Sequence, residues 1–244
     1  MSKAVFQDIL ADVKQAIESG EYPYQSYLPS ENELRARYLC SRTTVRRALA
    51  ALAAQGYVQP QQGKGVRVIR DISAKPPRGM KGIETFGEVA ARCGFDPLTR
   101  VNAFERVTAD PALSDTTGFP LGSDLTRIKR VRYADGSCVS SDDSYYLSDS
   151  VGDITPAIAE DSVYRYLEET LGVKIGAGTR DITIERPTEE DLRWLTVGDF
   201  NAVAVVRGKT YRVDGTLMEY TESRQAPSFF ALHETVFRSQ VPCA

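Results

Sequence analysis

Two helix starts followed by a glycine-rich hairpin make residues 28–70 the stretch that most constrains this chain. Ser30 and Glu33 have the spacing of a capping box, in which each side chain pairs with the backbone N–H of the other residue, so they predict a helix start. Ser41 precedes a second run of apolar residues at helical spacing, and Gly56 is placed to end it. The stretch therefore predicts two short helices joined by a tight turn.

A basic hairpin is predicted directly after the second helix. Residues 57–60 and 66–69 have the composition of strands, and the glycine-rich tip at 61–65 suits a turn. The order helix, turn, helix, hairpin predicts a winged helix-turn-helix, a fold that binds DNA. A solvated charged face is the alternative interpretation, and the order of the elements favours DNA binding over it. Residues 3–19 predict a further helix that covers the core of this domain.

The second helix and the hairpin tip supply the predicted DNA contacts. Arg42 and Arg46 can offer guanidinium forks to guanine edges or adjacent phosphates, while hydroxyls in the same turn hold the helix on the DNA backbone. Glycine at the hairpin tip lets the chain approach the minor groove or the flanking phosphates. The predicted DNA-binding residues are Asn32, Ser41, Arg42, Thr43, Thr44, Arg46, Gln62, Gly63, Lys64 and Gly65.

Charge divides the chain of 244 residues into two parts. Residues 1–70 carry ten Lys and Arg against six Asp and Glu, a net charge of +4, and the remainder carries twenty against twenty-seven, a net charge of −7. A positive segment can bind phosphates, whereas an acidic one is repelled by DNA. We therefore expect a DNA-binding domain over 1–70, a linker rich in Pro, Gly, Lys and Arg over 71–82, and a second domain over 83–244.

The second domain is predicted to be α+β with a mainly antiparallel sheet. Strand-like runs flank two Asp-Gly turns, at residues 135–136 and 214–215, which join antiparallel neighbours. The expected helices are 85–94, 162–172 and 188–197. In the last of them, Leu192, Trp194 and Leu195 are spaced to face the core.

Several classes of protein are disfavoured by what the sequence lacks. No apolar run approaches the ~20 residues needed to span a bilayer, and the N-terminal helix is not patterned like a signal peptide, so we expect a cytoplasmic protein. The four cysteines are far apart without C-x-x-C spacing, which is typical of reduced thiols. His233 is the only histidine, which argues against a catalytic triad or a multi-histidine metal site. We expect neither a metal nor another cofactor.

Family resemblance extends over nearly the whole chain. The winged helix-turn-helix of the GntR family of bacterial transcription regulators resembles the segment LPSENELRARYLCSRTTVRRALAALAAQGYVQPQQGKGVRV. The effector domain of the HutC subfamily, the UTRA domain with its chorismate-lyase-like fold, is similar to the blocks RVRYADG, SYYL, SVYRYLEETLG, TIERPTEEDLRWL and EYTESR. Within this subfamily, the chain looks most like trehalose-operon repressors, and the segments that carry this resemblance are TESR, FGEVAARCG and IERPTEEDLRWLTV.

The resemblance implies a homodimeric repressor of a sugar-utilisation operon. Such a protein would bind double-stranded, palindromic operator DNA and no membrane, and a phosphorylated sugar, with trehalose 6-phosphate as the best guess, would release it. Sensing of another sugar phosphate or of an amino-sugar phosphate is an alternative. A further alternative is a regulator that binds no small ligand and whose second domain serves only for dimerisation.

An anion-binding group is predicted in the second domain. Arg130 and Arg132 alternate along a strand, so both side chains project from one face and can hold phosphate oxygens. Pairing of the two arginines with surface carboxylates is the alternative. Ser162 and Tyr164 lie at a predicted helix start, where free amides favour an anion, and the resemblance places them in the same phosphate subsite.

Two acidic residues complete the predicted effector site. Asp142 and Glu219 match positions that in the related regulators hydrogen-bond sugar hydroxyls, a role suited to carboxylate acceptors. Two buried acids could instead belong to a glycosidase or a chorismate-lyase-like enzyme. Because a fused DNA-binding domain gives no reason for turnover, we expect no catalytic residues. The predicted effector-binding residues are Phe86, Arg130, Arg132, Asp142, Ser162, Tyr164, Glu219 and Arg224.

Overall fold

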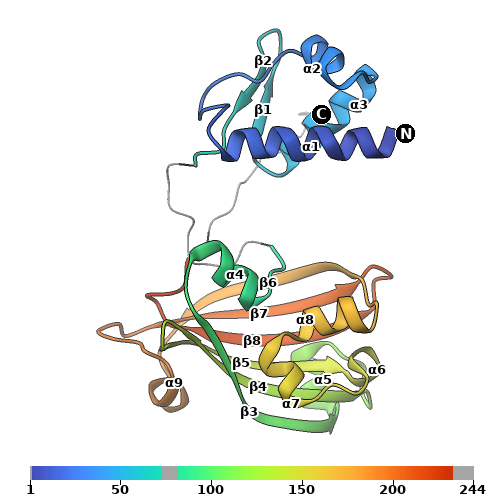
Figure 1. Cartoon of the computed structure of the whole chain (residues 1–244). Coiled ribbons are helices and arrows are strands. Elements are labelled where there is room, and N and C mark those ends of the chain that lie inside the picture. Colours follow the sequence, from blue (N-terminus) through green and yellow to red (C-terminus); the bar gives the residue numbers. More distant parts are fainter. Residues whose placement is uncertain (1, 73–81, 233–244) are drawn as a thin grey trace, which may run out of the picture. The chain divides into compact units, whose positions relative to one another are not determined.

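The computed structural model describes residues 2–72 and 82–232, which form two compact units (Figure 1). Most of the predicted linker lies outside the described residues, as do His233 and Cys243, so the domain boundaries at 70 and 83 stay predictions. Within the described part of the chain, no helix combines the length and the apolar character needed to cross a membrane.

Three helices and a two-stranded hairpin make up the N-terminal unit. They are α1 (Ser2–Glu18), α2 (Glu31–Tyr38), α3 (Arg42–Ala54), β1 (Val58–Gln61) and β2 (Gly65–Val68). The predicted capping box starts α2, because the Ser30 hydroxyl accepts from the Glu33 amide at 3.3 Å and the Glu33 carboxylate accepts from the Ser30 amide at 2.7 Å. Ser41 caps α3 by accepting from the Thr44 amide at 3.2 Å.

The core of this unit lies among all five elements. Helix α1 contributes Ile9, Val13 and Ile17, which recur at helical spacing and are fully buried. The other buried members of the cluster are Leu28, Leu34, Val45, Ala48, Leu49, Leu52, Tyr57, Val58 and Val68. Helices and hairpin therefore share one core, which fixes the exposed side of α3.

A six-stranded antiparallel sheet forms the C-terminal unit, in the spatial order β3-β4-β5-β8-β7-β6. The strands are β3 (Pro97–Thr108), β4 (Asp124–Ala134), β5 (Ser137–Leu147), β6 (Ile175–Glu185), β7 (Val203–Arg212) and β8 (Leu217–Gln225). The predicted Asp135-Gly136 turn joins β4 to β5 with both residues at positive φ, 50° and 79°, as a two-residue hairpin requires. The predicted α+β class with a mainly antiparallel sheet is confirmed.

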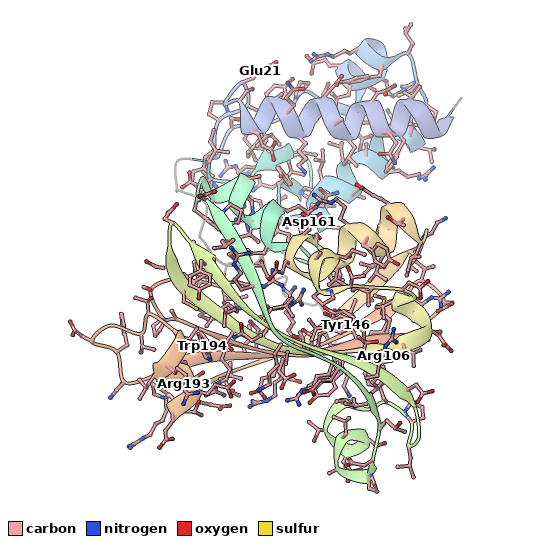
Figure 2. All side chains as sticks on the ribbon, turned by 60° about the horizontal axis from the view of Figure 1, so that its bottom comes forward. Glu21, Arg106, Tyr146, Asp161, Arg193 and Trp194 are labelled. Atoms are coloured by element: carbon pink, nitrogen blue, oxygen red, sulfur yellow. The ribbon has the colours of Figure 1, made fainter. Side chains whose placement is uncertain are left out.

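Short helices cover both faces of the sheet (Figure 2). The first face, here called the α4 face, packs against α4 (Phe86–Cys93), α7 (Pro156–Asp161) and α8 (Val163–Arg165). The second, the α9 face, packs against α5 (Pro111–Thr117) and the segment that follows α9 (Glu189–Trp194), while α6 (Ser148–Val151) follows β5. Side chains along each strand alternate between the two faces.

Two helix predictions need correction. Leu192 and Trp194 do not face the core, since they are 65% and 37% exposed. Helix α9 has only six residues and buries Asp191 instead, which binds Arg224 of the sheet, so this ion pair sets which side of the helix faces inward. The predicted helix 162–172 consists of the three-residue α8 followed by a π-helical turn, Tyr166–Thr170.

Candidate functional site

The exposed side of α3 carries three of the predicted DNA-binding residues. Arg42, Thr43 and Arg46 are exposed there. Thr44 is buried, and its hydroxyl lies 2.9 Å from the capping hydroxyl of Ser41. The prediction that Thr44 contacts the DNA backbone is therefore corrected, because its side chain helps to close the helix start.

A carboxylate on α2 holds the two arginines of α3. The Nε of Arg46 donates to both oxygens of Glu31, at 3.0 and 3.1 Å, and the Nε of Arg42 lies 3.7 Å from the same carboxylate. Arg42 also donates to the side-chain oxygen of Asn32 at 3.3 Å. Sequence reasoning overlooked Glu31, although its position one residue after the Ser30 cap places it opposite the start of α3.

The hairpin tip, Gln62 to Gly65, is exposed and glycine-rich, as predicted. Gly63 has a φ of +73°, with no atom within 4 Å of where a Cβ would stand. Tyr27 braces the hairpin next to its tip, since its hydroxyl donates to Gln61 at 2.8 Å and the Arg67 guanidinium lies 4.8 Å from its ring centroid. This brace holds the tip in place and was not predicted.

The α4 face carries a strip of buried polar side chains between two apolar clusters. One cluster lies under α4 and includes Val89 and Phe95, and the other lies under α7 and α8 and includes Val163 and Leu167. The strip consists of Arg130, Ser140, Asp142, Ser144, Thr210, Glu219, Ser223 and Gln225. Buried polar groups are costly unless they are paired, so such a strip indicates a built site.

Arg130 lies at the centre of the strip with 5% of its surface exposed. Its Nη2 donates to the hydroxyls of Ser144 and Tyr146, at 3.3 and 3.0 Å, and Figure 2 labels Tyr146 on the sheet. The Nε of Arg130 is buried without a hydrogen-bond partner among the described residues. Burial alone would lower the pKa of Arg130, but Tyr146, Asp142 and Glu219 outweigh it, so the guanidinium stays charged.

Arg132 is held next to Arg130 on the same face. Its Nε donates to Asp142 at 2.5 Å, and its guanidinium lies 5.2 Å from the ring centroid of Phe86 on α4. Asp142 also accepts from Ser140 and Ser223, at 2.6 and 2.7 Å. Burial would raise the pKa of Asp142, yet Arg132 and Arg130 hold it below the ordinary value. The alternative of surface carboxylates therefore does not apply, because the partner of Arg132 is buried.

Tyr164 brings α8 into the strip. Its hydroxyl donates to Glu219 and lies 2.9 Å from the Thr210 hydroxyl. Burial, followed by the charge of Glu219, raises the pKa of Tyr164 well above its ordinary value, so the phenol stays a donor. The structure thus brings together six of the eight predicted effector residues, namely Phe86, Arg130, Arg132, Asp142, Tyr164 and Glu219.

Ser162 and Arg224 stand apart from this group. The Ser162 hydroxyl caps α8 by accepting from the Arg165 amide at 3.2 Å, and the Ser162 amide donates to Ile158. The Ser162 hydroxyl is therefore engaged at the start of α8, and its predicted contact with an anion stays a prediction. Arg224 alternates with Ser223 on β8 and so lies on the α9 face, where it binds Asp191 at 2.9 Å. It does not line the same site as Arg130.

An ion-pair network on the α9 face surrounds Arg224. Glu185 accepts from Arg224 at 3.0 Å and from Arg207 at 2.9 Å, and Arg207 also donates to Glu222 at 2.8 Å. The hydrogen bonds from Arg207 and then Arg224 lower the pKa of Glu185 to about 2. The network therefore links β6, β7 and β8, which are neighbours in the sheet.

Glu185→Gln is expected to destabilise the C-terminal unit at neutral pH and much less in acid. The pKa of Glu185 falls from 4.5 to about 2 on folding, so its charge contributes stability above pH 4.5 that is lost as the pH falls toward 2. Urea unfolding followed by the fluorescence of Trp194, the only tryptophan, measures the difference from wild type at each pH. A difference that stays constant from pH 7 to pH 3 would contradict this assignment.

Two family models match successive parts of the chain. The model of bacterial regulatory proteins of the gntR family matches residues 6–68, and that of the UTRA domain matches residues 92–230. The regulator TreR of Bacillus subtilis (strain 168) is 35% identical over 219 residues, which cover 90% of this chain and 91% of TreR. The chain belongs to the GntR family. The predicted family is thereby confirmed.

Other GntR regulators are similar at lower identity. The mannosyl-D-glycerate transport/metabolism system repressor MngR of Escherichia coli (strain K12) is 26% identical, with 91% of each chain covered. The solved YydK of Bacillus subtilis covers 96% of this chain and 99% of its own, with a TM-score of 0.79 at 19% identity, which shows a shared fold. The effector binding domain of the B. subtilis trehalose repressor covers 59% and 99%, with a TM-score of 0.52 at 29% identity.

This GntR protein is thus a transcriptional regulator with an N-terminal DNA-binding helix-turn-helix and a C-terminal UTRA domain. The enzyme alternative is excluded, since its relatives are regulators and repressors. The buried acids Asp142 and Glu219 fit this conclusion, because their hydrogen bonds go to Arg132, Tyr164 and neighbouring hydroxyls within the strip.

Proposed function

We propose that this regulator is a homodimeric repressor of a sugar-utilisation operon, released from its operator by a phosphorylated sugar. Two copies would each place α3 in a major groove of a palindromic site, so that protein symmetry mirrors operator symmetry. Trehalose 6-phosphate is the first candidate effector, and the 35% identity with TreR supports that choice. Effector binding would weaken DNA affinity through a different affinity for the two states of the protein.

The observation that carries the effector proposal is the unpartnered Nε of Arg130. A buried guanidinium has five N–H donors, and here the described hydrogen bonds go only to the neutral hydroxyls of Ser144 and Tyr146. A phosphate oxygen would satisfy the unpartnered Nε through a charge-assisted bond. Asp142 already holds Arg132, which leaves Arg130 as the principal anchor for an anion.

Hydroxyl groups around Arg130 support a sugar as the remainder of the ligand. Thr210 shares a hydrogen bond with Tyr164 at 2.9 Å, Thr221 shares one with Ser144 at 2.8 Å, and Ser223 donates to Asp142 at 2.7 Å. Hydroxyls both donate and accept, so they can exchange these partners for the hydroxyls of a sugar. The proposed effector-binding residues are Phe86, Arg130, Arg132, Asp142, Tyr164 and Glu219.

A ligand panel tests the effector proposal. The full-length protein is mixed with trehalose 6-phosphate, glucosamine 6-phosphate, trehalose or inorganic phosphate, and both its melting temperature and its release from DNA are measured. The DNA is a duplex selected by the protein from a random-sequence pool. We expect trehalose 6-phosphate to raise Tm and to release the duplex, and trehalose to do neither.

The other outcomes of the panel are equally informative. A response to glucosamine 6-phosphate alone would support the anion site but would make an amino-sugar phosphate, and not trehalose 6-phosphate, the effector. Absence of a response to every phosphorylated compound would overturn the effector proposal and favour a C-terminal domain that only dimerises.

Arg46→Ala is expected to weaken binding to the selected duplex about 10- to 100-fold. The reason is that one bidentate contact between a guanidinium and a base, which contributes about 1–3 kcal/mol, is lost. Arg46 is proposed to contact bases together with Arg42, while Thr43 and the tip from Gln62 to Gly65 contact the backbone. A gel shift measures the affinity, and the rise in Tm with trehalose 6-phosphate should persist.

Arg165→Ala is the matched control for Arg46→Ala. Arg165 is an exposed arginine of α8 that pairs with Asp161, and its removal should leave DNA affinity unchanged. Wild-type affinity in the Arg46 variant would contradict the assignment of α3 as the DNA-reading helix.

A further inference from the structure

Glu31 sits where one carboxylate can reach both arginines of α3. Arg42 and Arg46 are four residues apart, so they lie on the same side of the helix, one turn from each other. The carboxylate accepts from Arg46 through two bonds, at 3.0 and 3.1 Å, and lies 3.7 Å from Arg42. As the first residue of α2, Glu31 is also favoured by the helix dipole.

The contact with Glu31 uses the Nε edge of the Arg46 guanidinium and leaves the Nη edge available for other contacts. Both described hydrogen bonds of Arg46 run from Nε, and none runs from Nη1 or Nη2. The two Nη groups form the fork that matches O6 and N7 of guanine. The side chain is 64% exposed, so this fork remains accessible while its stem is oriented by Glu31.

Charge gives Glu31 a second effect. A carboxylate among two arginines reduces the local charge from +2 to +1, and it repels phosphates that approach the pair. Binding to arbitrary DNA depends mainly on phosphate neutralisation, whereas binding to a chosen sequence also depends on base-edge contacts. A group that orients the fork and removes charge therefore weakens arbitrary binding more than operator binding.

We propose that Glu31 is a positioning residue that raises the preference of Arg42 and Arg46 for operator DNA over other DNA. This inference rests on the proposed role of α3 as the DNA-reading helix. Glu31 itself need not touch the operator, because it acts through the two guanidinium groups.

Glu31→Gln tests the proposal, since glutamine keeps an acceptor for Arg46 and removes the charge. The full-length variant is titrated with the selected duplex and with a scrambled duplex of equal length, at several salt concentrations. We expect tighter binding to the scrambled duplex, a fall of about ten-fold in the ratio of the two affinities, and a salt slope steeper by about 0.9. An unchanged ratio would overturn the proposal.

Glu33→Gln is the matched control, because it makes the same change of charge two residues along the same helix. The Glu33 carboxylate bonds the Ser30 amide and neither arginine. An equal fall in the affinity ratio with this variant would show a general charge effect and overturn the specific role of Glu31.

Arg46→Ala separates the two hypotheses. If the proposed function fails, that variant binds the selected duplex as wild type does. If only this inference fails, Arg46→Ala weakens operator binding while Glu31→Gln leaves the affinity ratio unchanged.

Discussion

Arg130→Met should abolish the release of DNA by trehalose 6-phosphate while DNA binding itself persists. The substitution removes the guanidinium whose Nε has no partner among the described residues, and methionine fills a similar volume. Hydrogen bonds to charged groups contribute about 1.5–3 kcal/mol each, so effector affinity should fall by about 10- to 100-fold or more. Calorimetry with trehalose 6-phosphate measures the affinity, and a gel shift measures the release.

Arg127→Met provides the control on the same strand. Arg127 lies three positions before Arg130, so it projects to the α9 face, where it binds Asp143 at 2.7 Å. Effector affinity should be unchanged in this variant. Equal losses in the two variants would mean that the sheet as a whole, and not the strip on the α4 face, determines binding.

Asp142→Asn is expected to destabilise the C-terminal unit by about 3–5 kcal/mol, the usual cost of breaking a buried ion pair. Asp142 is 7% exposed, and asparagine would leave the charges of Arg132 and Arg130 without the compensation of its carboxylate. Urea unfolding followed by Trp194 fluorescence reports on this unit, because the tryptophan lies on α9. The midpoint should shift strongly at neutral pH.

Asp143→Asn is the neighbouring control. Asp143 points to the α9 face and pairs with Arg127 and Lys129, and its side chain is 29% exposed, so the loss should stay at or below about 1 kcal/mol. The double variant Asp142→Asn with Arg132→Gln should recover part of the stability, since it removes the uncompensated charge. A double variant as unstable as the sum of the single ones would argue against a charge effect.

Local patterns were enough to predict the elements that depend on neighbouring residues. The capping box at Ser30, the cap at Ser41 and the Asp135-Gly136 turn are all present, and the strand-like run predicted before that turn is β4. Each depends on contacts within a few residues, which the sequence displays directly. Alternation along β4 likewise placed Arg130 and Arg132 on one face.

Features that depend on distant partners were not predictable in the same way. The orientation of α9 follows from the pair between Asp191 and Arg224, which are 33 positions apart, and not from the spacing of Leu192 and Trp194. The same pair removes Arg224 from the effector strip. Glu31 was overlooked because its partner Arg46 belongs to a different helix.

The last strand of the sheet, β8, lies between β5 and β7 and not at an edge. Ser223 therefore reaches Asp142 across 81 positions, and Glu219 meets Tyr164 across 55. Contacts of such long range form late, and domains fold from the N-terminus as the chain is synthesised. The N-terminal unit can thus be folded before the strip around Arg130 is complete. A chain interrupted before β8 would lack both Ser223 and Glu219, and with them the partners of Asp142 and Tyr164 on that strand.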